Sequence, residues 1–255
     1  MPTSIFLSDL HIASKKCKAK QLNNFLKNIE TDQIFLVGDI IDAWRFHQSF
    51  KFSIQEQIEH INVIRKLLKH AAKKQHVYYV YGNHDEIMEK FGEVGVFGNI
   101  SVCERTSYIS SNNKKYLVIH GQQFDILSKY NWGKFIGKIG DVGYEILIDI
   151  NEAYNKIRKL FGLKYFSLSK LAKVKIKKAA YFIHNFETAL AEYAKLNGYD
   201  GVVCGHIHDP SDKMIDGIHY LNCGCWTDTS NMTYLIDTGD GTGLHLKNYH
   251  PEDKV

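Results

Sequence analysis

The stretch IFLVGDIID, residues 34–42, decides the fold of this 255-residue chain. Its apolar run, residues 34–37, does not alternate with polar residues, which is typical of a strand buried on both faces of a parallel sheet. The run ends at Gly38, where the backbone can turn sharply, and the carboxylates Asp39 and Asp42 follow. Because ligands of open α/β sheets bind outside the carboxyl ends of strands, the stretch predicts a binding edge there.

Strands and helices alternate on both sides of this stretch. Strand runs lie at residues 4–7 and 77–81, and helical patterns lie at residues 19–29 and 54–71. Parallel strands need crossover connections, so this β-α-β-α-β order predicts parallel pairing. One face of the longer helix is marked by Ile54, Ile58, Ile61, Ile64, Leu68 and Ala71.

The second half of the chain has a different character. Residues 106–109 and 116–119 flank Asn112-Asn113, which predicts a β-hairpin. Residues 127–198 are mostly helical in pattern, with a repeat of apolar side chains at helical spacing. Strand runs return at residues 201–204, 218–221, 232–236 and 244–249.

This order predicts an α/β domain with an insertion. Residues 1–124 and 199–255 form the expected catalytic domain, and residues 125–198 form a helical cap inserted into it. The composition, with 44% hydrophobic and 24% charged residues, is that of an ordinary globular protein. The net charge of +4 is too mild to imply nucleic acid as a partner.

The cysteines and the N-terminus bear on where the protein works. Five cysteines occur without a C-x-x-C pair, which favours buried thiols in a reducing compartment. The N-terminus has no signal-peptide pattern, and no apolar run reaches the length of a membrane span. The expected location is therefore the cytoplasm.

Side chains that bind metals follow five of the strand runs. They are Asp9 and His11, Asp39 and Asp42, Asn83 with His84 and Asp85, His120, and His206 with His208. In an extended chain, residues i and i+2 point the same way, so each Asp-x-His or His-x-His pair can face one crevice. A mixture of carboxylate, imidazole and amide ligands suits Mn²⁺, Fe or Zn better than Ca²⁺. The sequence therefore predicts a metal site at the edge of the sheet.

The order of these motifs resembles a known family. Asp-x-His, Gly-Asp-x-x-Asp, Gly-Asn-His-Asp, His-Gly and Gly-His-x-His, between Asp9 and His208, look like the calcineurin-like metallophosphoesterases. The resemblance implies a four-layer α/β/β/α sandwich with two metal ions. It assigns one ion to Asp9, His11, Asp39 and His208, and the other to Asp39, Asn83, His120 and His206, with Asp39 bridging.

The resemblance also implies roles beyond metal binding. Two cations lower the pKa of a bridging water and stabilise charge on phosphoryl oxygens. Asn83 and His84 would contact the phosphate, and His84 would protonate the leaving oxygen while Asp42 orients its ring. Asp42 could instead serve only as a turn or helix-cap residue. For Asp85, a helix N-cap is favoured over a group that supports the ligands.

One branch of the family fits the whole layout. Residues 38–44, His120-Gly121 and residues 205–210, with the helical insertion, resemble the UDP-2,3-diacylglucosamine pyrophosphatases of lipid A synthesis. This implies release of UMP from a nucleotide-linked glycolipid, a preference for Mn²⁺ over Fe, Zn or Mg²⁺, and a peripheral position at the inner face of the membrane. Arg158 and a lysine cluster would face the anionic substrate or the membrane. The aromatic residues expected to shape an acyl pocket, or simply the core of the insertion, are Tyr130, Trp132, Phe135, Tyr165 and Phe166.

Three positions depart from that branch. His84 replaces an arginine, Gln122 replaces an acidic residue after His-Gly, and Cys225 replaces an aspartate before Trp226. These changes leave the metal ligands intact. Two alternatives stay open: an enzyme of the same fold that acts on another nucleotide or nucleotide-linked substrate, and a membrane-associated scaffold without activity. The oligomeric state is not predicted.

Overall fold

The structure, a computed structural model, describes residues 2–73, 75–92, 96–124, 168–229 and 232–250. The chain divides into two compact units, residues 1–124 with 188–255, and residues 125–187. The first unit holds two β-sheets and the candidate site. The second contains the N-terminal part of helix α6 (Leu168–Leu196). The expected extent of the inserted cap, and its aromatic residues, fall mainly outside the described residues and stay predictions.

A seven-stranded sheet carries the parallel strands expected from the sequence. Its order is β12-β11-β1-β2-β3-β5-β4, with β1, β2, β3 and β5 paired in parallel. The strands are β1 (Ser4–Leu7), β2 (Gln33–Val37), β3 (His76–Val80), β4 (Val96–Phe97), β5 (Ile100–Cys103), β11 (Thr233–Asp237) and β12 (His245–Asn248). The carboxyl ends of β1, β2 and β3 therefore meet at one edge of the sheet.

A five-stranded sheet has the order β6-β7-β8-β10-β9. Its strands are β6 (Arg105–Ile109), β7 (Lys115–Ile119), β8 (Gly201–Cys204), β9 (Ser211–Ile215) and β10 (Ile218–Asn222). The predicted hairpin is confirmed, with Asn113 at a φ of 61° in its turn. Because β7 and β8 are parallel neighbours, the segments that begin at His120 and Gly205 emerge side by side.

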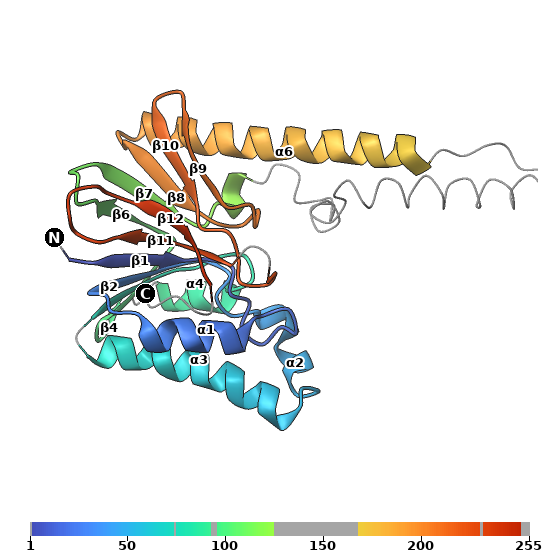
Figure 1. Ribbon diagram of the computed structural model, residues 1–255, viewed down its shortest axis with the longest axis vertical. Coiled ribbons are helices and arrows are strands. Elements are labelled where there is room, and N and C mark those ends of the chain that lie inside the picture. Colours follow the sequence, from blue (N-terminus) through green and yellow to red (C-terminus); the bar gives the residue numbers. More distant parts are fainter. Residues whose placement is uncertain (1, 74, 93–95, 125–167, 230–231, 251–255) are drawn as a thin grey trace, which may run out of the picture. The chain divides into compact units, whose positions relative to one another are not determined.

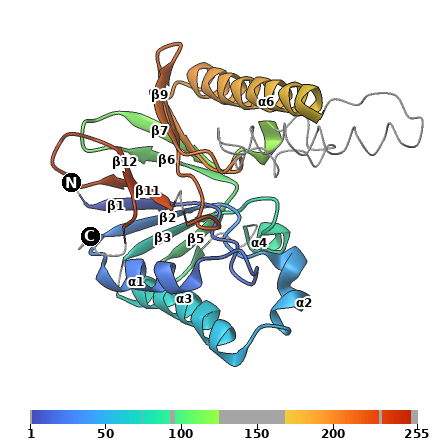
Figure 2. The same ribbon diagram turned by 45° about the vertical axis from the view of Figure 1, so that its right-hand side comes forward.

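The two sheets pack face to face and are flanked by helices, as Figures 1 and 2 show. Between them, Phe35 stacks on Phe6 and on Tyr78, each with ring centroids 4.4 Å apart. Helices α1 (Ala19–Asn28) and α3 (Ile54–Ala72) cover the other face of the seven-stranded sheet. The fold is thus a mixed α/β sandwich, as predicted. The shorter elements are η1 (Ala43–Arg45), α2 (Phe46–Ser49), α4 (Glu86–Gly92) and η2 (Gln122–Phe124).

Helix α3 begins at a capping box, in which the Ser53 hydroxyl accepts from the Glu56 N–H and the Glu56 carboxylate accepts from the Ser53 N–H. Its existence was predicted, but the apolar face read from the sequence is not the face that packs on the core. The buried residues are Val63, Leu67, His70 and Ala71. Of the predicted face, only Ala71 is buried, and the exposed residues are Ile54, Ile58, Ile61, Ile64 and Leu68. The helix has two apolar stripes, and contact with α1 selects one of them.

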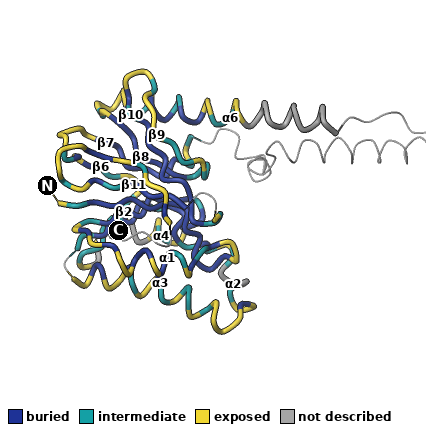
Figure 3. The backbone as a smooth tube through the Cα atoms, in the orientation of Figure 1, coloured by how far each residue is buried: buried dark blue, intermediate teal, exposed yellow. Residues whose placement is uncertain are grey.

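Burial follows the layers (Figure 3): the central strands β1 and β8 are buried along their whole length, whereas the edge strands β9 and β12 and the outer sides of the helices are largely exposed. All five cysteines are free thiols, four of them buried, as the sequence suggests. Among the described residues, no helix combines the length and the apolar character that a membrane span requires.

Candidate metal centre

Five strand ends deliver the predicted side chains to one edge. Asp9 and His11 follow β1, Asp39 and Asp42 follow β2, Asn83 and His84 follow β3, His120 follows β7, and His206 and His208 follow β8. Among the described residues, three overlapping sets could hold a metal ion: Asp9, His11 and His208; His11, Asp39 and His84; and Asp9, Asp39 and His120. Arg158 lies outside the described residues.

The candidate ligands have an unusual backbone. Asp9, His11, Asp39, His206 and His208 adopt positive φ values of 53°, 47°, 54°, 69° and 58°. This left-handed conformation is uncommon for residues other than glycine and costs on the order of 1–3 kcal/mol each. The extended-chain explanation for the Asp-x-His and His-x-His pairs is therefore wrong. The chain leaves the strand at once, and successive left-handed turns direct both side chains of each pair.

Backbone hydrogen bonds hold the loops after β1 and β2 together. The Asp9 N–H donates to the Gly38 carbonyl at 3.0 Å, and the His11 N–H donates to the Asp39 carbonyl at 2.9 Å. Gly38 has a φ of 78°, and a Cβ there would lie 2.3 Å from the His120 ring. Only glycine lets the β2 loop approach the imidazole this closely.

We call Asp9, His11 and His208 the outer group. The Nε2 of His208 lies 2.9 Å from Asp9 Oδ1 and 3.4 Å from His11 Nε2. The Nε2 of His11 is also 3.8 Å from Asp9 Oδ1 and 3.7 Å from Asp39 Oδ2. The His208 side chain is 32% exposed, so this group borders the solvent.

We call Asp39, Asn83, His120 and His206 the inner group. Asp39 Oδ1 lies 3.4 Å from His120 Nε2 and accepts a 2.8 Å hydrogen bond from the His84 N–H. The Nδ1 of His120 donates to the Val37 carbonyl at 2.9 Å, which directs Nε2 to the carboxylate. The His206 ring lies edge-on to the His120 ring, with centroids 5.2 Å apart. Asp39 thus presents one oxygen to each group.

Buried polar atoms that lack a hydrogen-bond partner indicate whether the site suits a cation. Asp9 Oδ1, Asn83 Oδ1 and His120 Nε2 are buried and have no hydrogen-bond partner. Such atoms are rare in folded proteins, because a buried polar atom without a partner costs about 1–3 kcal/mol. All three are lone-pair donors of the kinds that bind Mn²⁺, Fe or Zn. The residues present therefore fit a site for divalent metal.

The charges of the site support one another without a metal. Burial lowers the pKa of His120, but the Asp39 carboxylate outweighs it and raises that pKa to about 9. For His208, burial is likewise outweighed by Asp9, and the pKa rises to about 10. Burial raises the pKa of Asp9, but His208 and His11 hold it well below its usual value. A divalent ion would take over the role that these protons play.

His84 and Asp42 lie beside the two groups. The Nδ1 of His84 is 3.2 Å from Asp42 Oδ1, and its Nε2 is 3.9 Å from Asp39 Oδ2. Asp42 also accepts from the Arg45 N–H at 3.2 Å, so it closes the following turn as well. Its other oxygen lies 3.6 Å from His11 Nδ1. Asp42 is therefore placed to orient two imidazoles at once.

Asp85 has a different role from the one favoured by the sequence. Its carboxylate does not cap α4 but accepts from the N–H groups of Ile40 and Ile41, at 3.0 and 2.8 Å, and from the Tyr79 hydroxyl at 2.9 Å. It also accepts from the Gly82 N–H. Asp85 does directly precede α4, and its backbone carbonyl accepts from the Met88 N–H, but its carboxylate supports the ligand loops, because its donors lie in the loop after β2, on β3 and in the loop after β3. Asp85 ties the Asp39 loop to the loop of Asn83 and His84.

Sequence patterns missed two further neighbours of the site. The Ser8 hydroxyl donates to Asp9 Oδ2 at 2.5 Å and fixes which oxygen faces the outer group. The half-exposed Trp44 lies against His84, with ring centroids 4.2 Å apart. Gln122 and Cys225, noticed as departures, are also informative. Gln122 Oε1 is buried without a partner, and the Cys225 thiol interacts with His208.

Comparison with known proteins places these observations in a family. A family model described as "Calcineurin-like phosphoesterase" matches residues 3–210. Among curated proteins, no sequence matches the chain. Similar solved structures include Yfce, a phosphoesterase from E. coli, with 13% identity, a TM-score of 0.45 and coverage of 96% of this chain and 98% of that one.

Two other solved structures are similar to a comparable degree. A novel archaeal phosphodiesterase has 13% identity, a TM-score of 0.44 and coverage of 96% and 99% of the two chains. A predicted phosphoesterase from Streptococcus pneumoniae TIGR4 has 14% identity, a TM-score of 0.40 and coverage of 92% and 81%. Likenesses this distant carry no information on substrate.

Proposed function

The chain belongs to the calcineurin-like phosphoesterase family and is a hydrolase of phosphoester bonds; we propose that it works with two divalent metal ions held by the inner and outer groups. One ion would be held by Asp9, His11, Asp39 and His208. The other would be held by Asp39, Asn83, His120 and His206. When bound, such ions activate a water molecule and neutralise charge on the phosphoryl oxygens.

One observation carries this proposal. Asp9 Oδ1, Asn83 Oδ1 and His120 Nε2 come from three different strand ends, and all are buried without a partner. The first belongs to the outer group and the other two to the inner group, and Asp39 presents an oxygen to each. Unsatisfied atoms on both sides of a shared carboxylate favour two ions over one.

His84 would act on the substrate rather than on a metal. Its Nδ1 is occupied by Asp42, so Nε2 is the atom left to face the reacting phosphate. A proton held at Nε2 can pass to the leaving oxygen, and Asp42 stabilises the ring in that orientation. The backbone N–H of His84 donates to Asp39 Oδ1, and this hydrogen bond fixes the position of His84 relative to the inner group.

For the substrate we propose UDP-2,3-diacylglucosamine, hydrolysed to UMP and 2,3-diacylglucosamine 1-phosphate. The support is the sequence resemblance around residues 38–44 and 205–210 and the presence of a long insertion. Trp44, half-exposed against His84, offers a ring at the mouth of the site. The proposed Arg158 contact and acyl pocket concern residues 125–167, which lie outside the described part of the chain. Mn²⁺ is the proposed metal, because the resemblance implies it and a mixture of carboxylate, amide and imidazole ligands can hold it.

Two assays test this in sequence. Hydrolysis of bis-p-nitrophenyl phosphate with added Mn²⁺ tests the phosphoesterase, with Asp39→Ala as the inactive control. An inactive wild-type protein that still binds Mn²⁺ would instead support the scaffold alternative. Product analysis with UDP-2,3-diacylglucosamine then tests the substrate. If the protein hydrolyses the chromogenic ester but releases no UMP, the proposed metal centre is supported and the proposed lipid substrate is refuted.

A further inference from the structure

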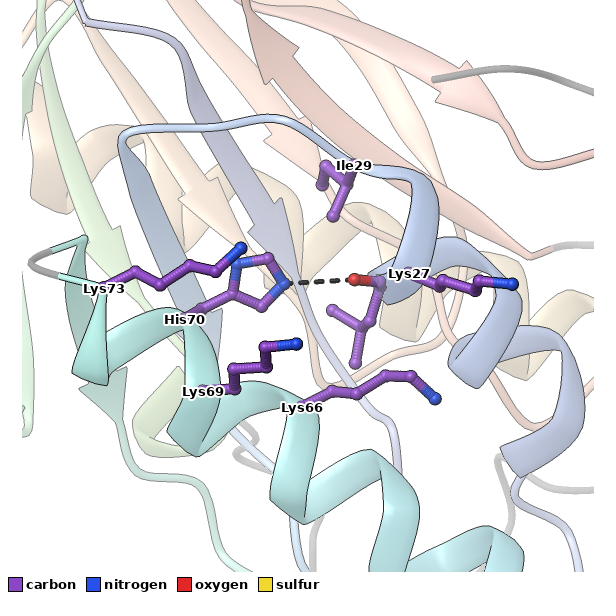
Figure 4. A pocket seen from close by; sticks show the side chains of 7 residues that line it. Lys27, Ile29, Lys66, Lys69, His70 and Lys73 are labelled. Atoms are coloured by element: carbon purple, nitrogen blue, oxygen red, sulfur yellow. Dashed lines mark hydrogen bonds between the residues drawn. The ribbon is translucent and has the colours of Figure 1, made fainter.

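The C-terminal parts of helices α1 and α3 form a groove of about 130 Å³ between them. Two apolar residues line it together with Lys27, Lys66, Lys69, His70 and Lys73, and none of its lining residues is acidic. Figure 4 shows the four lysine side chains around the groove, three from the end of α3 and one from α1. Because α1 precedes β2 and α3 precedes β3, the groove lies at the amino ends of these strands. It is therefore at the opposite edge of the sheet from the candidate metal centre.

His70 lines this groove as a buried cation. Its Nε2 lies 3.1 Å from the Leu26 carbonyl, a contact drawn in Figure 4, and its Nδ1 lies 2.6 Å from Gln75 Oε1. The orientation of the Gln75 amide is fixed, because its Nε2 donates to the Thr31 carbonyl. Both ring nitrogens of His70 therefore face acceptors. Only an imidazolium can donate to both, because a neutral ring carries one N–H.

The positive charge of the groove is matched by little negative charge. Among the residues that the structure describes, no carboxylate forms an ion pair with any of the four lysines, and Lys66 donates to the Asn23 amide oxygen at 2.7 Å. Burial lowers the pKa of Lys66, and Arg65 and Lys27 add to this against the attraction of Glu59.

The two helices compensate only part of this charge. The C-termini of α1 and α3 each supply about half a negative charge, so together they offset about one of the five positive charges. An anion that carries more than one negative charge would balance much of the rest.

From the groove and its charges we propose a second ligand site, which binds a phosphate or pyrophosphate group of a small soluble molecule or of a lipid headgroup. Lysine ammonium groups bind phosphate as point charges, and a multiply charged phosphate offsets more of the charge than a carboxylate can. The groove has the volume of about four water molecules at about 30 Å³ each, which suits one compact anionic group. Its ligand is distinct from the phosphoester at the metal centre, because the two sites lie at opposite edges of the sheet.

Calorimetric titration of the full chain with inorganic phosphate and with pyrophosphate tests this site. The groove variant combines Lys69→Gln and Lys73→Gln, which keeps the Lys66 bond to Asn23 and both hydrogen bonds of His70. Binding in the groove should weaken at least about tenfold, because bonds to charged groups are lost.

The matched control removes the same charge elsewhere. It combines Lys114→Gln and Lys195→Gln, two exposed lysines that lie just before β7 and on α6. This variant should bind phosphate as the wild type does. Phosphate bound at the metal centre is common to all three proteins, so only a loss confined to the groove variant supports the proposed site. Circular dichroism would confirm that both variants are folded.

Vesicles separate the two sources of the phosphate group. Flotation with vesicles of phosphatidylcholine and phosphatidic acid, lost in the groove variant and absent with phosphatidylcholine alone, would assign the groove to a lipid headgroup. Binding of soluble pyrophosphate that depends on the groove, without flotation, would assign it to a small soluble molecule. The site is overturned if the groove variant binds phosphate, pyrophosphate and vesicles as the wild type does, or if the wild type binds none of them.

Discussion

The inner and outer groups differ in how fully they are formed before any ion binds. His120 is fully buried, and its ring is fixed by the Val37 carbonyl, so that Nε2 already faces Asp39. His208 is one-third exposed and has closed onto Asp9 at 2.9 Å. In the inner group the imidazole of His120 stays 3.4 Å from the carboxylate of Asp39, whereas in the outer group the imidazole of His208 lies against the carboxylate of Asp9.

This difference shows how far the fold arranges each set of ligands before a metal ion binds. A backbone carbonyl fixes an imidazole at no cost when the metal arrives, because nothing has to move. Side chains that pair with each other must first separate, and their mutual attraction opposes the ion. We therefore expect the inner group to bind an ion more tightly than the outer group.

Asp39→Ala should have the largest effect, because Asp39 belongs to both groups. Each ion supplies several kcal/mol of transition-state stabilisation, so losing both should lower kcat/KM by about 10⁴-fold or more. Calorimetric titration with Mn²⁺ should show both binding events weakened. Asp212→Ala is the control, because the Asp212 carboxylate is paired with His219, at 2.8 Å, and belongs to neither group. Retention of one tight event would show that Asp39 is not shared.

His84→Ala should lower kcat by about 10²–10⁴-fold, the range for removal of a general acid. Metal affinity should be unchanged in both groups, because His84 is assigned to the substrate. Asp42→Asn should lower kcat less, by about 10–100-fold, as loss of an orienting partner does. If His84→Ala released a metal ion, His84 would belong among the ligands and the division into two groups would need revision.

His120→Ala and His208→Ala compare the two groups directly. His120→Ala removes a ligand that is already in position, so it should weaken one Mn²⁺ binding event by more than about 100-fold. This is more than the loss expected for a residue that only hydrogen-bonds to a ligand. His208→Ala should weaken the other event by only about tenfold, because water can take the exposed position and Asp9 is released. Equal losses in calorimetry would contradict the difference in preorganisation.

Acidity should weaken metal binding in the two groups to a similar extent. Metal binding needs neutral imidazoles, and the pKa values of His120 and His208 are raised to about 9 and 10. Mn²⁺ affinity should therefore rise by about tenfold per pH unit for each proton displaced, up to those values. Proton release measured in two buffers of different ionisation enthalpy would check this. Binding independent of pH between 6 and 9 would refute it.

The metal-free protein should show the opposite trend. The raised pKa values of His120 and His208 contribute stability that is fully present below their unfolded pKa, about 6.5, and is lost as pH rises toward 9 and 10. The lowered pKa values of Asp9 and Asp39 contribute stability that is lost only in acid. Thermal unfolding with a chelator should thus give a higher Tm at pH 6 than at pH 9.

Local sequence patterns were enough to predict the strands that carry the site. Residues 34–37, buried and without alternation, form β2, and the β-α-β-α-β order gives a parallel sheet. Metal-type residues just after strands had to meet, because parallel strands end at the same edge. These inferences need only the neighbours of each residue along the chain.

Long-range contacts decided what the sequence left open. The side of α3 that is buried is the one that packs on α1, and it carries Val63, Leu67, His70 and Ala71 rather than the row of isoleucines that the sequence pattern indicated. Asp85 looked like a helix cap because its donors, the N–H groups of Ile40 and Ile41, are more than forty residues away. The left-handed turns at Asp9 and His208 are imposed by the loops between which they lie. A residue's type and spacing specify what it can bind, but only the packed chain specifies which partners reach it.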